Sequence, residues 1–398
     1  MFQTIERRPP DPILGLSAAY IEDKNPDKID LGVGVYKDEE GKTPVVSAIK
    51  KAEQKLWQSE VSKSYVAQAG PAGFNEATVR MILGDNSAAL NNQRTCSVLA
   101  PGGSGALRVA AEFVNRNFPR TRTWVSTPTW ANHVPLLSSA GLELVEYPYY
   151  NYESHEIEFE KMMDTLKKAK VGDLVLVHGC CHNPCGGDLN WEQWQAFAEA
   201  AEKQGFTPFI DLAYQGLGDG LEEDVKGVRL LAERLPEVII ASSCSKNFGL
   251  YRERTGSVTL IGETPDQVSA SHSQILSTAR QIYSMPPSHG AQLVEIVLAD
   301  EELKAEWLAE LTEMRERINN LRSELVVKLQ EAGVQQDFFF IEREKGMFSF
   351  LGLSVEQVQT LIKDYSIYLV NSSRINVAGI NQRNIEYLAR SVASVLQA

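Results

Sequence analysis

Three things are scarce in this sequence: cysteine, positive charge and long hydrophobic runs. Five cysteines in 398 residues are too few, and too unevenly spaced, for a scaffold held together by disulfides. Lys and Arg (39) are outnumbered by Asp and Glu (52), which gives a formal net charge of −13. We therefore expect no nucleic-acid partner, because binding to a phosphate backbone needs a basic face.

Hydrophobic runs of membrane length are also missing. No stretch approaches the roughly 18 consecutive apolar residues of a membrane span. The N-terminal segment has no apolar core of the kind that signal peptides carry. We expect a cytoplasmic protein with no membrane partner, whose 398 residues are enough for two or three domains.

The usual nucleotide-binding fingerprints are absent from the glycine-rich segment 99–113. Its Gly102, Gly103 and Gly105 follow an apolar run, but their spacing matches neither G-x-G-x-x-G nor the G-K-[ST] of a P-loop. Nicotinamide and nucleoside triphosphate ligands are therefore disfavoured. A helix that starts after such a turn can still bind an anion through its free backbone N–H groups. A purely structural turn is the alternative.

The middle of the chain alternates short apolar runs with amphipathic stretches. Helices are predicted over 106–118 and 191–205, the second ending at Gly205. Strands are predicted over seven ranges: 97–103, 123–130, 142–148, 174–180, 207–214, 238–245 and 257–262. Strands that are apolar on both faces and alternate with helices predict an α/β fold with a mainly parallel sheet, covered by helices on both sides.

The pattern changes after about residue 300. Helical periodicity continues over 301–332 and stops at Gly333, so a long helix could lead into a second unit formed by the C-terminal residues. In that unit we predict strands over 338–344 and 346–353, and helices over 355–365 and 382–396. The first 43 residues look loop-rich and could join either unit.

Lys246 is the first candidate for chemistry, because it comes directly after a buried strand. Open α/β sheets bind ligands at the carboxyl ends of their strands. A partly desolvated lysine there has a lowered pKa and can react with an aldehyde. Ser243, Ser245 and Arg254 surround it in sequence, and hydroxyls with a guanidinium suit a phosphate. The alternative is a solvated surface lysine.

Asp211 ends another predicted strand. A buried carboxylate needs a partner, which could be a protonated ring nitrogen of a cofactor or simply a nearby His or Arg. Tyr214, three residues on, could donate a hydrogen bond to a phenolate-like oxygen.

Segment 178–190 contains Cys180, Cys181, His182 and Cys185, which superficially look like metal ligands. Adjacent residues at a strand end should point to opposite faces, and no second cluster completes a tetrahedron. We therefore expect no metal site.

Together these segments resemble the fold-type I pyridoxal-phosphate enzymes, specifically the class I aminotransferases of the aspartate and aromatic-amino-acid group. The resemblance covers essentially the whole chain. It also includes LGVGVYKDEEGKTPV (31–45), KSYVAQAGPAGF (63–74), PTWANH (128–133), YSMPPSHGA (283–291) and SSRINVAG (372–379). It implies an N-terminal arm (1–12), a small α/β domain (13–43 and 314–398) and a large cofactor domain (44–313) with a mainly parallel seven-stranded sheet.

The resemblance implies roles around pyridoxal 5′-phosphate. Lys246 would hold the cofactor covalently and then move a proton between the substrate Cα and the cofactor. Asp211, supported by His133, would keep the ring nitrogen protonated. Asn183 and Tyr214 would bind the phenolic oxygen, and Trp130 would stack on the ring.

The phosphate and the substrate would have their own groups. The residues implied for the phosphate are Gly103, Ser104, Ser243, Arg254 and, from a neighbouring subunit, Tyr65. The residues implied for the substrate are Gly34, Trp130, Asn183, Arg374 for the α-carboxylate and Arg280, also from the partner, for a distal carboxylate. A homodimer with shared active sites is thus implied, with amino acids and 2-oxo acids as substrates.

Some positions depart from the aspartate-specific pattern. Ser104 stands where those members usually have Thr, Met285 where they usually have Asn, and Ser64 where Asn is common. Val35, Lys37 and Thr43 look like the aspartate subgroup, and Cys185 replaces a Thr in the Asn-Pro turn.

These departures favour an aromatic-amino-acid aminotransferase of dual range. It would pass the amino group of Phe, Tyr or Trp, and of aspartate, to 2-oxoglutarate in a ping-pong cycle between pyridoxal and pyridoxamine phosphate. The alternative is a strict aspartate aminotransferase. An effector-binding module is disfavoured because the resemblance begins within the first dozen residues, and β-elimination or decarboxylation as side activities stay open.

Overall fold

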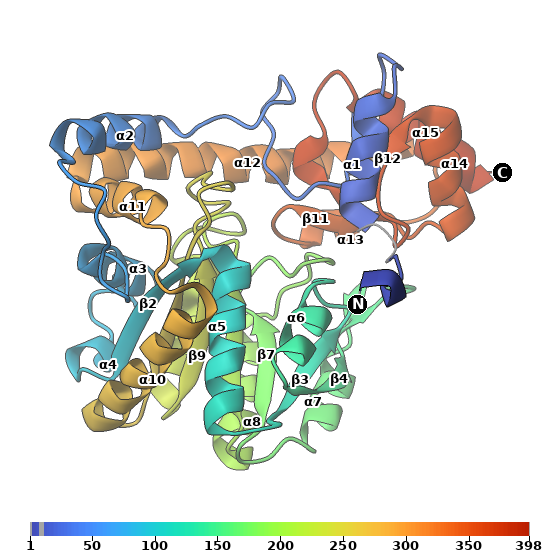
Figure 1. Ribbon diagram of the computed structural model, residues 1–398. Helices are drawn as coiled ribbons and strands as arrows, with labels where there is room; N and C mark the ends of the chain where they lie inside the picture. The colour runs from blue at the N-terminus through green and yellow to red at the C-terminus, as the bar shows by residue number, and fades with distance from the viewer. Residues whose placement is uncertain (1, 8–11, 398) are drawn as a thin grey trace. The chain divides into compact units, whose positions relative to one another are not determined.

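The structure is a computed structural model that describes residues 2–7 and 12–397 (Figure 1). It divides the chain into two compact units, Pro44–Glu316 and a second made of Met1–Thr43 with Arg317–Ala398. The second junction lies after Glu316, where the sequence placed it after residue 313. Part of the expected N-terminal arm, residues 1 and 8–11, lies outside the described residues. Within the described part of the chain, no helix combines the length and apolar character that a membrane crossing requires.

The larger unit is built on a seven-stranded sheet with the order β2-β10-β9-β8-β7-β3-β4. The strands are β2 (Thr95–Pro101), β3 (Arg122–Thr127), β4 (Glu143–Pro148), β7 (Leu174–His178), β8 (Thr207–Leu212), β9 (Val238–Ser243) and β10 (Thr255–Ile261). Only β10 runs antiparallel to its neighbours, and the other pairs are parallel. The prediction of a mainly parallel α/β sheet is confirmed.

Helices connect these strands. They are α2 (Ser47–Ser59), α3 (Ala72–Leu83), α4 (Ala88–Asn91), α5 (Gly102–Asn117), α6 (His133–Ser139), α7 (Phe159–Leu166), α8 (Trp191–Gln204), α9 (Lys226–Arg234), α10 (Pro265–Tyr283), α11 (His289–Ala299) and the start of α12 (Glu301–Glu331). A two-stranded ribbon, β5 (Tyr150–Asn151) with β6 (Glu156–Ile157), and the 3₁₀ helix η2 (Glu223–Val225) complete the unit. The helix predicted over 191–205 is α8; it begins at an Asn190 capping box and ends at Gly205 with φ +76°.

Helices cover both faces of this sheet, as Figure 1 shows for α5, α6 and α10 on the near side. That side forms one apolar core with Phe209 and Ala241 of the strands. On the other side Ile210 and Leu212 face Val228 of α9, close to Gly179. The alternation along β8 explains both contacts, because successive side chains of a strand point to opposite faces.

The smaller unit combines short strands and helices. Its elements are η1 (Phe2–Thr4), α1 (Pro12–Glu22), β1 (Ile29–Asp30), the end of α12, α13 (Phe340–Arg343), β11 (Phe348–Phe350), α14 (Val355–Tyr365), β12 (Ile367–Tyr368), β13 (Arg374–Asn376), η3 (Val377–Gly379) and α15 (Ile385–Gln397). β1 pairs with β12 in parallel, and β11 with β13 antiparallel. The first 43 residues are thus less loop-rich than expected, since α1 lies among them.

The strand predicted over 338–344 is wrong, because residues Phe340–Arg343 form helix α13. The buried Arg322 side chain of α12 explains this. Its Nη1 donates to the carbonyl of Ile341 at 2.8 Å, and its Nη2 donates to the carbonyls of Gly346 and Phe348, each at 2.7 Å. A guanidinium that satisfies carbonyls on a turn favours the turn over an extended strand.

Replacing this guanidinium should destabilise the protein strongly. Arg322 is 1% exposed, and its Nη1 lies 3.9 Å from a carboxylate oxygen of Glu344. We expect Arg322→Ala to lower the free energy of unfolding by about 3–5 kcal/mol, because a buried charge and several carbonyls lose their partner. Urea unfolding of the purified variant measures this. The exposed neighbour Arg343 is the control, and Arg343→Ala should cost under about 0.5 kcal/mol. Equal losses in both variants would contradict the prediction.

Candidate active site

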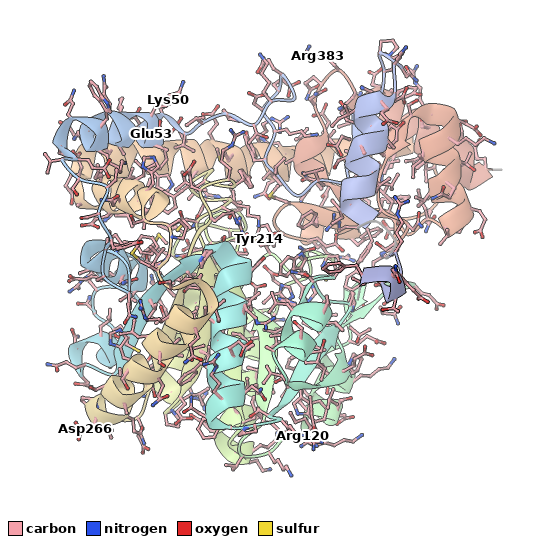
Figure 2. The ribbon with its side chains drawn as sticks, in the orientation of Figure 1. Lys50, Glu53, Arg120, Tyr214, Asp266 and Arg383 are labelled. Carbon is pink, nitrogen blue, oxygen red and sulfur yellow. The ribbon has the colours of Figure 1, made fainter. Side chains whose placement is uncertain are left out.

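Three neighbouring strands bring candidate side chains to one edge of the large sheet. Lys246 follows β9, Asp211 lies near the end of β8, and Asn183 follows β7. These strands are adjacent and parallel, so their carboxyl ends meet at the same edge. Figure 2 shows Tyr214, just after β8, at the opposite end of this unit from Arg120, which precedes β3.

Lys246 is partly buried in this edge. Its Nζ lies 4.8 Å from the centroid of the Tyr214 ring. Burial, together with the nearby Arg254 guanidinium, lowers the pKa of Lys246 to about 8, although the Asp211 carboxylate acts in the opposite direction. About a tenth of the amine is therefore uncharged at pH 7, far more than for an ordinary lysine, and the uncharged form is the one that a nucleophile or a proton acceptor requires.

Asp211 is held by a chain of hydrogen bonds behind it. Its Oδ2 lies 2.8 Å from Nε2 of His133, whose Nδ1 lies 2.7 Å from the Thr129 hydroxyl; His178 Nε2 lies 3.3 Å from the same hydroxyl. Burial of Asp211 opposes its charge, but the hydrogen bond from His133 and the electrostatic interactions with His133, His178 and Lys246 together outweigh it, and the pKa lies below its usual value. Asp211 is a permanent anion at neutral pH. Trp130 packs edge-on against His133, with ring centroids 5.3 Å apart.

Asn183 sits on a loop that is fixed by a carboxylate. Asp188 accepts hydrogen bonds from the backbone N–H groups of Cys181 (2.6 Å) and His182 (2.9 Å). The Asn183 side-chain amide donates to the Tyr214 hydroxyl at 3.4 Å. These two polar groups therefore lie side by side at the sheet edge.

An anion cradle lies where α5 begins. A Cβ on Gly102 would lie 2.4 Å from Nη2 of Arg254, and one on Gly103 would lie 3.2 Å from Cβ of Ser243. The glycines thus let the helix start approach the guanidinium and hydroxyl closely, with the half-buried Ser104 in the first turn. Ser243 Oγ also donates to Ser245 Oγ at 3.0 Å. Backbone N–H groups, a hydroxyl and a guanidinium together suit a phosphate.

In the smaller unit, Arg374 is oriented by its surroundings. Its Nη2 donates to the carbonyl of Gly32 at 2.7 Å, and its guanidinium lies 4.4 Å from the centroid of the Phe348 ring. A Cβ on Gly34 would lie 2.9 Å from Cζ of Phe348. Gly34 and Arg374 thus both lie against the Phe348 ring.

The residues expected to reach a partner's site lie on the surface of the chain. Tyr65 is 91% exposed, and Arg280 of α10 is exposed, with Nη1 3.5 Å from the Ser284 hydroxyl. The backbone N–H of Val66, which follows Tyr65 in the sequence, donates to Met285 Sδ at 3.1 Å.

Sequence reasoning missed the residues behind the site. His178 and Thr129 support His133, and Asp188 supports the Asn183 loop. The register pairs His178 with Asp211 on adjacent parallel strands, so their proximity could have been inferred once the strand order was known.

The expectation that Cys180 and Cys181 point to opposite faces is wrong. Cys181 has a φ of +50°, and its Sγ lies within 4.8 Å of both the Cys180 Sγ and a carboxylate oxygen of Asp224. The positive φ turns the second side chain back toward the first. The third member of this cluster, Asp224, belongs to η2. No residue spacing in the sequence indicated that it lies near the two cysteines.

Comparisons with known proteins agree with this geometry. The model of the family described as "Aminotransferase class I and II" matches residues 26–392. The chain belongs to this family. It is 47% identical to an aspartate aminotransferase of Salmonella typhi over 396 residues, covering 100% of both chains. It is 44% identical to an aromatic-amino-acid aminotransferase of Pseudomonas aeruginosa, covering 99% of this chain and 98% of the relative.

A solved structure shows the same fold. It is an aromatic-amino-acid aminotransferase from Burkholderia pseudomallei covalently bound to pyridoxal phosphate, with a TM-score of 0.97 and 40% identity, covering 100% of this chain and 99% of that one. The present chain is thus a pyridoxal-phosphate-dependent aminotransferase of fold type I. The residues at the sheet edge fit that cofactor: they offer a lysine, a permanent carboxylate, a phenol with an amide, and an anion cradle that a Cβ on Gly102 would fill.

The pKa of Lys246 sets a pH dependence for loading this aminotransferase. An amine attacks an aldehyde only when it is unprotonated. The rate at which the apoprotein takes up pyridoxal phosphate should therefore rise with pH and level off above about 8, rather than near the usual value of about 10.4. Stopped-flow absorbance across pH 6–11 measures it. In Asp211→Asn the midpoint should move to lower pH, because the charge that favours the protonated amine is lost. A midpoint near that of an exposed lysine would contradict the assignment.

Proposed function

We propose that this aminotransferase transfers the amino group of phenylalanine, tyrosine, tryptophan and aspartate to 2-oxoglutarate. A strict aspartate aminotransferase is the alternative. The observation that carries the dual range is the anchored Met285. Its thioether accepts the Val66 N–H, and this flexible apolar side chain comes five positions after Arg280 in the sequence. In this proposal Met285 contacts the ring of an aromatic substrate, and Arg280 binds the distal carboxylate of an acidic one.

In this proposal the residues of the large sheet edge bind and activate the cofactor. The pyridoxal ring supplies an electron sink for the negative charge that develops at the substrate Cα. Asp211 keeps the ring nitrogen protonated because it is charged at neutral pH. Asn183 and Tyr214 hold the ring oxygen, and Trp130 covers the ring. Lys246 accepts the proton from Cα, and its lowered pKa suits this role.

The phosphate and the substrate are held by cationic groups. The α5 start with Gly103, Ser104, Ser243 and Arg254 holds the phosphate, joined by Tyr65 of a second copy. Arg374, with Gly34 nearby, binds the substrate α-carboxylate through its fork of N–H groups. Arg280, also from a second copy, binds a distal carboxylate.

A homodimer is part of the proposal. Trp57, Val61 and Tyr65 are 80%, 97% and 91% exposed, and they follow one another from the end of α2. Large apolar side chains exposed along one short segment favour a covered interface. A second copy of this chain would cover them and bring Tyr65 and Arg280 to its neighbour's site.

Kinetics with two donors test the substrate range. With 2-oxoglutarate as acceptor, we expect kcat/KM for phenylalanine to lie within about a thousandfold of that for aspartate, which corresponds to about 4 kcal/mol. We expect Arg280→Ala to lower kcat/KM for aspartate by about 10²- to 10³-fold, because a carboxylate loses its partner, and to change that for phenylalanine less than about tenfold.

The control is Arg120→Ala, whose side chain is 81% exposed at the other end of the unit; it should change neither value. A phenylalanine value more than a thousandfold below that for aspartate would overturn the dual range and leave the strict aspartate enzyme.

A further inference from the structure

The turn that carries Lys246 is held by a tryptophan from another part of the chain. Trp307 belongs to α12, and its indole Nε1 donates to the backbone carbonyl of Asn247 at 2.7 Å. Its ring stacks on that of Phe248, with ring centroids 4.3 Å apart and an angle of 4° between the ring planes. Both Trp307 and Phe248 are 0% exposed. The indole therefore contacts the two residues that follow Lys246.

The backbone of this turn is fixed on both sides of the lysine. On the N-terminal side, Ser243 Oγ accepts a hydrogen bond from the N–H of Ser245 at 3.2 Å. On the C-terminal side, the N–H of Gly249 donates to the carbonyl of Lys246 at 3.2 Å, next to the bond from Trp307. A lysine has a flexible four-carbon stem, so the position of its amine depends on how firmly its backbone is held.

The same face of α12 also supports the loop that carries Tyr214. Leu311 and Arg315 follow Trp307 at intervals of four residues, so the three side chains lie along one face of the helix. A Cβ on Gly216 would lie 2.5 Å from Cδ2 of Leu311, and Nη1 of Arg315 donates to the carbonyl of Gly216 at 3.4 Å. Successive turns of one helix thus contact the loops that follow β8 and β9.

We propose that Trp307 is a positioning residue for amino transfer: its hydrogen bond to Asn247 keeps the Lys246 amine in place beside the Tyr214 ring. The indole acts only through the backbone, because its N–H group is bonded to a carbonyl. The inference rests on the role proposed for Lys246 in amino transfer.

The position of the amine affects its pKa. Burial is the largest effect on the pKa of Lys246, which lies at about 8; the Asp211 carboxylate raises this pKa and the Arg254 guanidinium lowers it. The Tyr214 ring is the aromatic neighbour of the amine. A turn that is released from α12 lets water reach the amine, so the pKa rises toward the ordinary value of about 10.4. Loss of the indole bond should therefore change a pH dependence as well as a rate.

Trp307→Phe tests the proposal, because phenylalanine keeps a ring that can stack on Phe248 but has no N–H group. We expect kcat with aspartate and 2-oxoglutarate to fall about 10- to 100-fold, since a small misplacement of a reacting group has such an effect. KM should change less than about threefold, because the substrate-binding groups are untouched. The midpoint of the pH dependence of cofactor loading, measured by stopped-flow absorbance, should rise by at least about 0.5 pH unit.

Trp124→Phe is the matched control. Trp124 is also buried, at 3% exposed, and its Nε1 donates to Oδ2 of Asp173 at 2.9 Å. Asp173 directly precedes β7, so this bond lies at the opposite edge of the sheet from Lys246, which follows β9. The control loses the same kind of bond from the same kind of side chain. It should keep the wild-type loading midpoint, and a kcat within about twofold of the wild-type value.

A second variant covers the case in which Trp307→Phe does not fold. Benzothienylalanine at position 307 has the shape of tryptophan with sulfur in place of the N–H group, so it removes the hydrogen bond alone and should give the same shift. An unchanged midpoint in a folded variant at position 307, or an equal shift in Trp124→Phe, would overturn the inference. Failure of the role of Lys246 itself looks different: Lys246→Ala would then still retain the cofactor after borohydride, which would overturn both proposals.

Discussion

Lys246→Ala should lower kcat for amino transfer by at least about 10⁴-fold, the upper range for loss of a general acid–base group. Its amine is the group whose pKa burial lowers to about 8, at the sheet edge beside Tyr214 and Asp211. The methyl group of alanine can neither accept the proton from the substrate Cα nor bind the cofactor covalently. Steady-state rates with aspartate and 2-oxoglutarate measure the loss.

A second readout separates this role from a general disturbance of the site. Borohydride should fix the cofactor to the wild-type chain and leave it removable from Lys246→Ala. Lys226→Ala is the control, because that side chain is 62% exposed on α9, and it should keep both the rate and the covalent fixation. A variant at position 246 that still holds the cofactor irreversibly would show that another amine does this chemistry.

Asp211→Asn should lower kcat by about 10²- to 10³-fold, equivalent to about 3–4 kcal/mol. The amide is nearly the same shape as the carboxylate but carries no charge, so it cannot stabilise a protonated ring nitrogen. Burial opposes the charge of Asp211, but the hydrogen bond from His133 and the electrostatic interactions with His133, His178 and Lys246 together keep the pKa below its usual value. The wild-type carboxylate therefore stays charged throughout the neutral range, and protonation of Asp211 should not limit the rate there.

An exposed aspartate provides the control for the loss of kcat expected in Asp211→Asn. Asp266, at the start of α10, is exposed, and Asp266→Asn should leave kcat unchanged. Cofactor content, measured by absorbance after alkaline release, should remain near one per chain in both variants. A kcat above a tenth of the wild-type value in Asp211→Asn would mean that the charge contributes little.

The central site was predictable because it depends on a general property of parallel sheets. Lys246, Asp211 and Asn183 each follow or end a strand that the sequence indicates clearly, and adjacent parallel strands place such residues at one edge. The order of those strands was not predictable, since it results from pairing between segments far apart in sequence. His178 and Thr129 were missed for that reason.

Two failures came from interactions that no local pattern contains. The apolar residues 338–344 have the composition of a strand, but Arg322 binds the carbonyl of Ile341 from another helix. Cys180 and Cys181 were expected on opposite faces, but the positive φ of Cys181 brings the two sulfurs together. In both cases tertiary contacts outweighed local preference.

The edge position of β2 has a consequence for biosynthesis. β2 has one neighbour in the sheet, β10, whose residues follow it by more than 150 positions. A ribosome that has made β2 and α5 must still add β9 and β10 before that strand has a partner. The anion cradle, which brings Gly102 and Gly103 close to Ser243 and Arg254, is therefore completed late in translation. A nascent chain that stops before residue 254 has every part of the α5 turn but lacks the Arg254 guanidinium that faces it. If the proposed phosphate role holds, we expect cofactor binding only after β10 has been made.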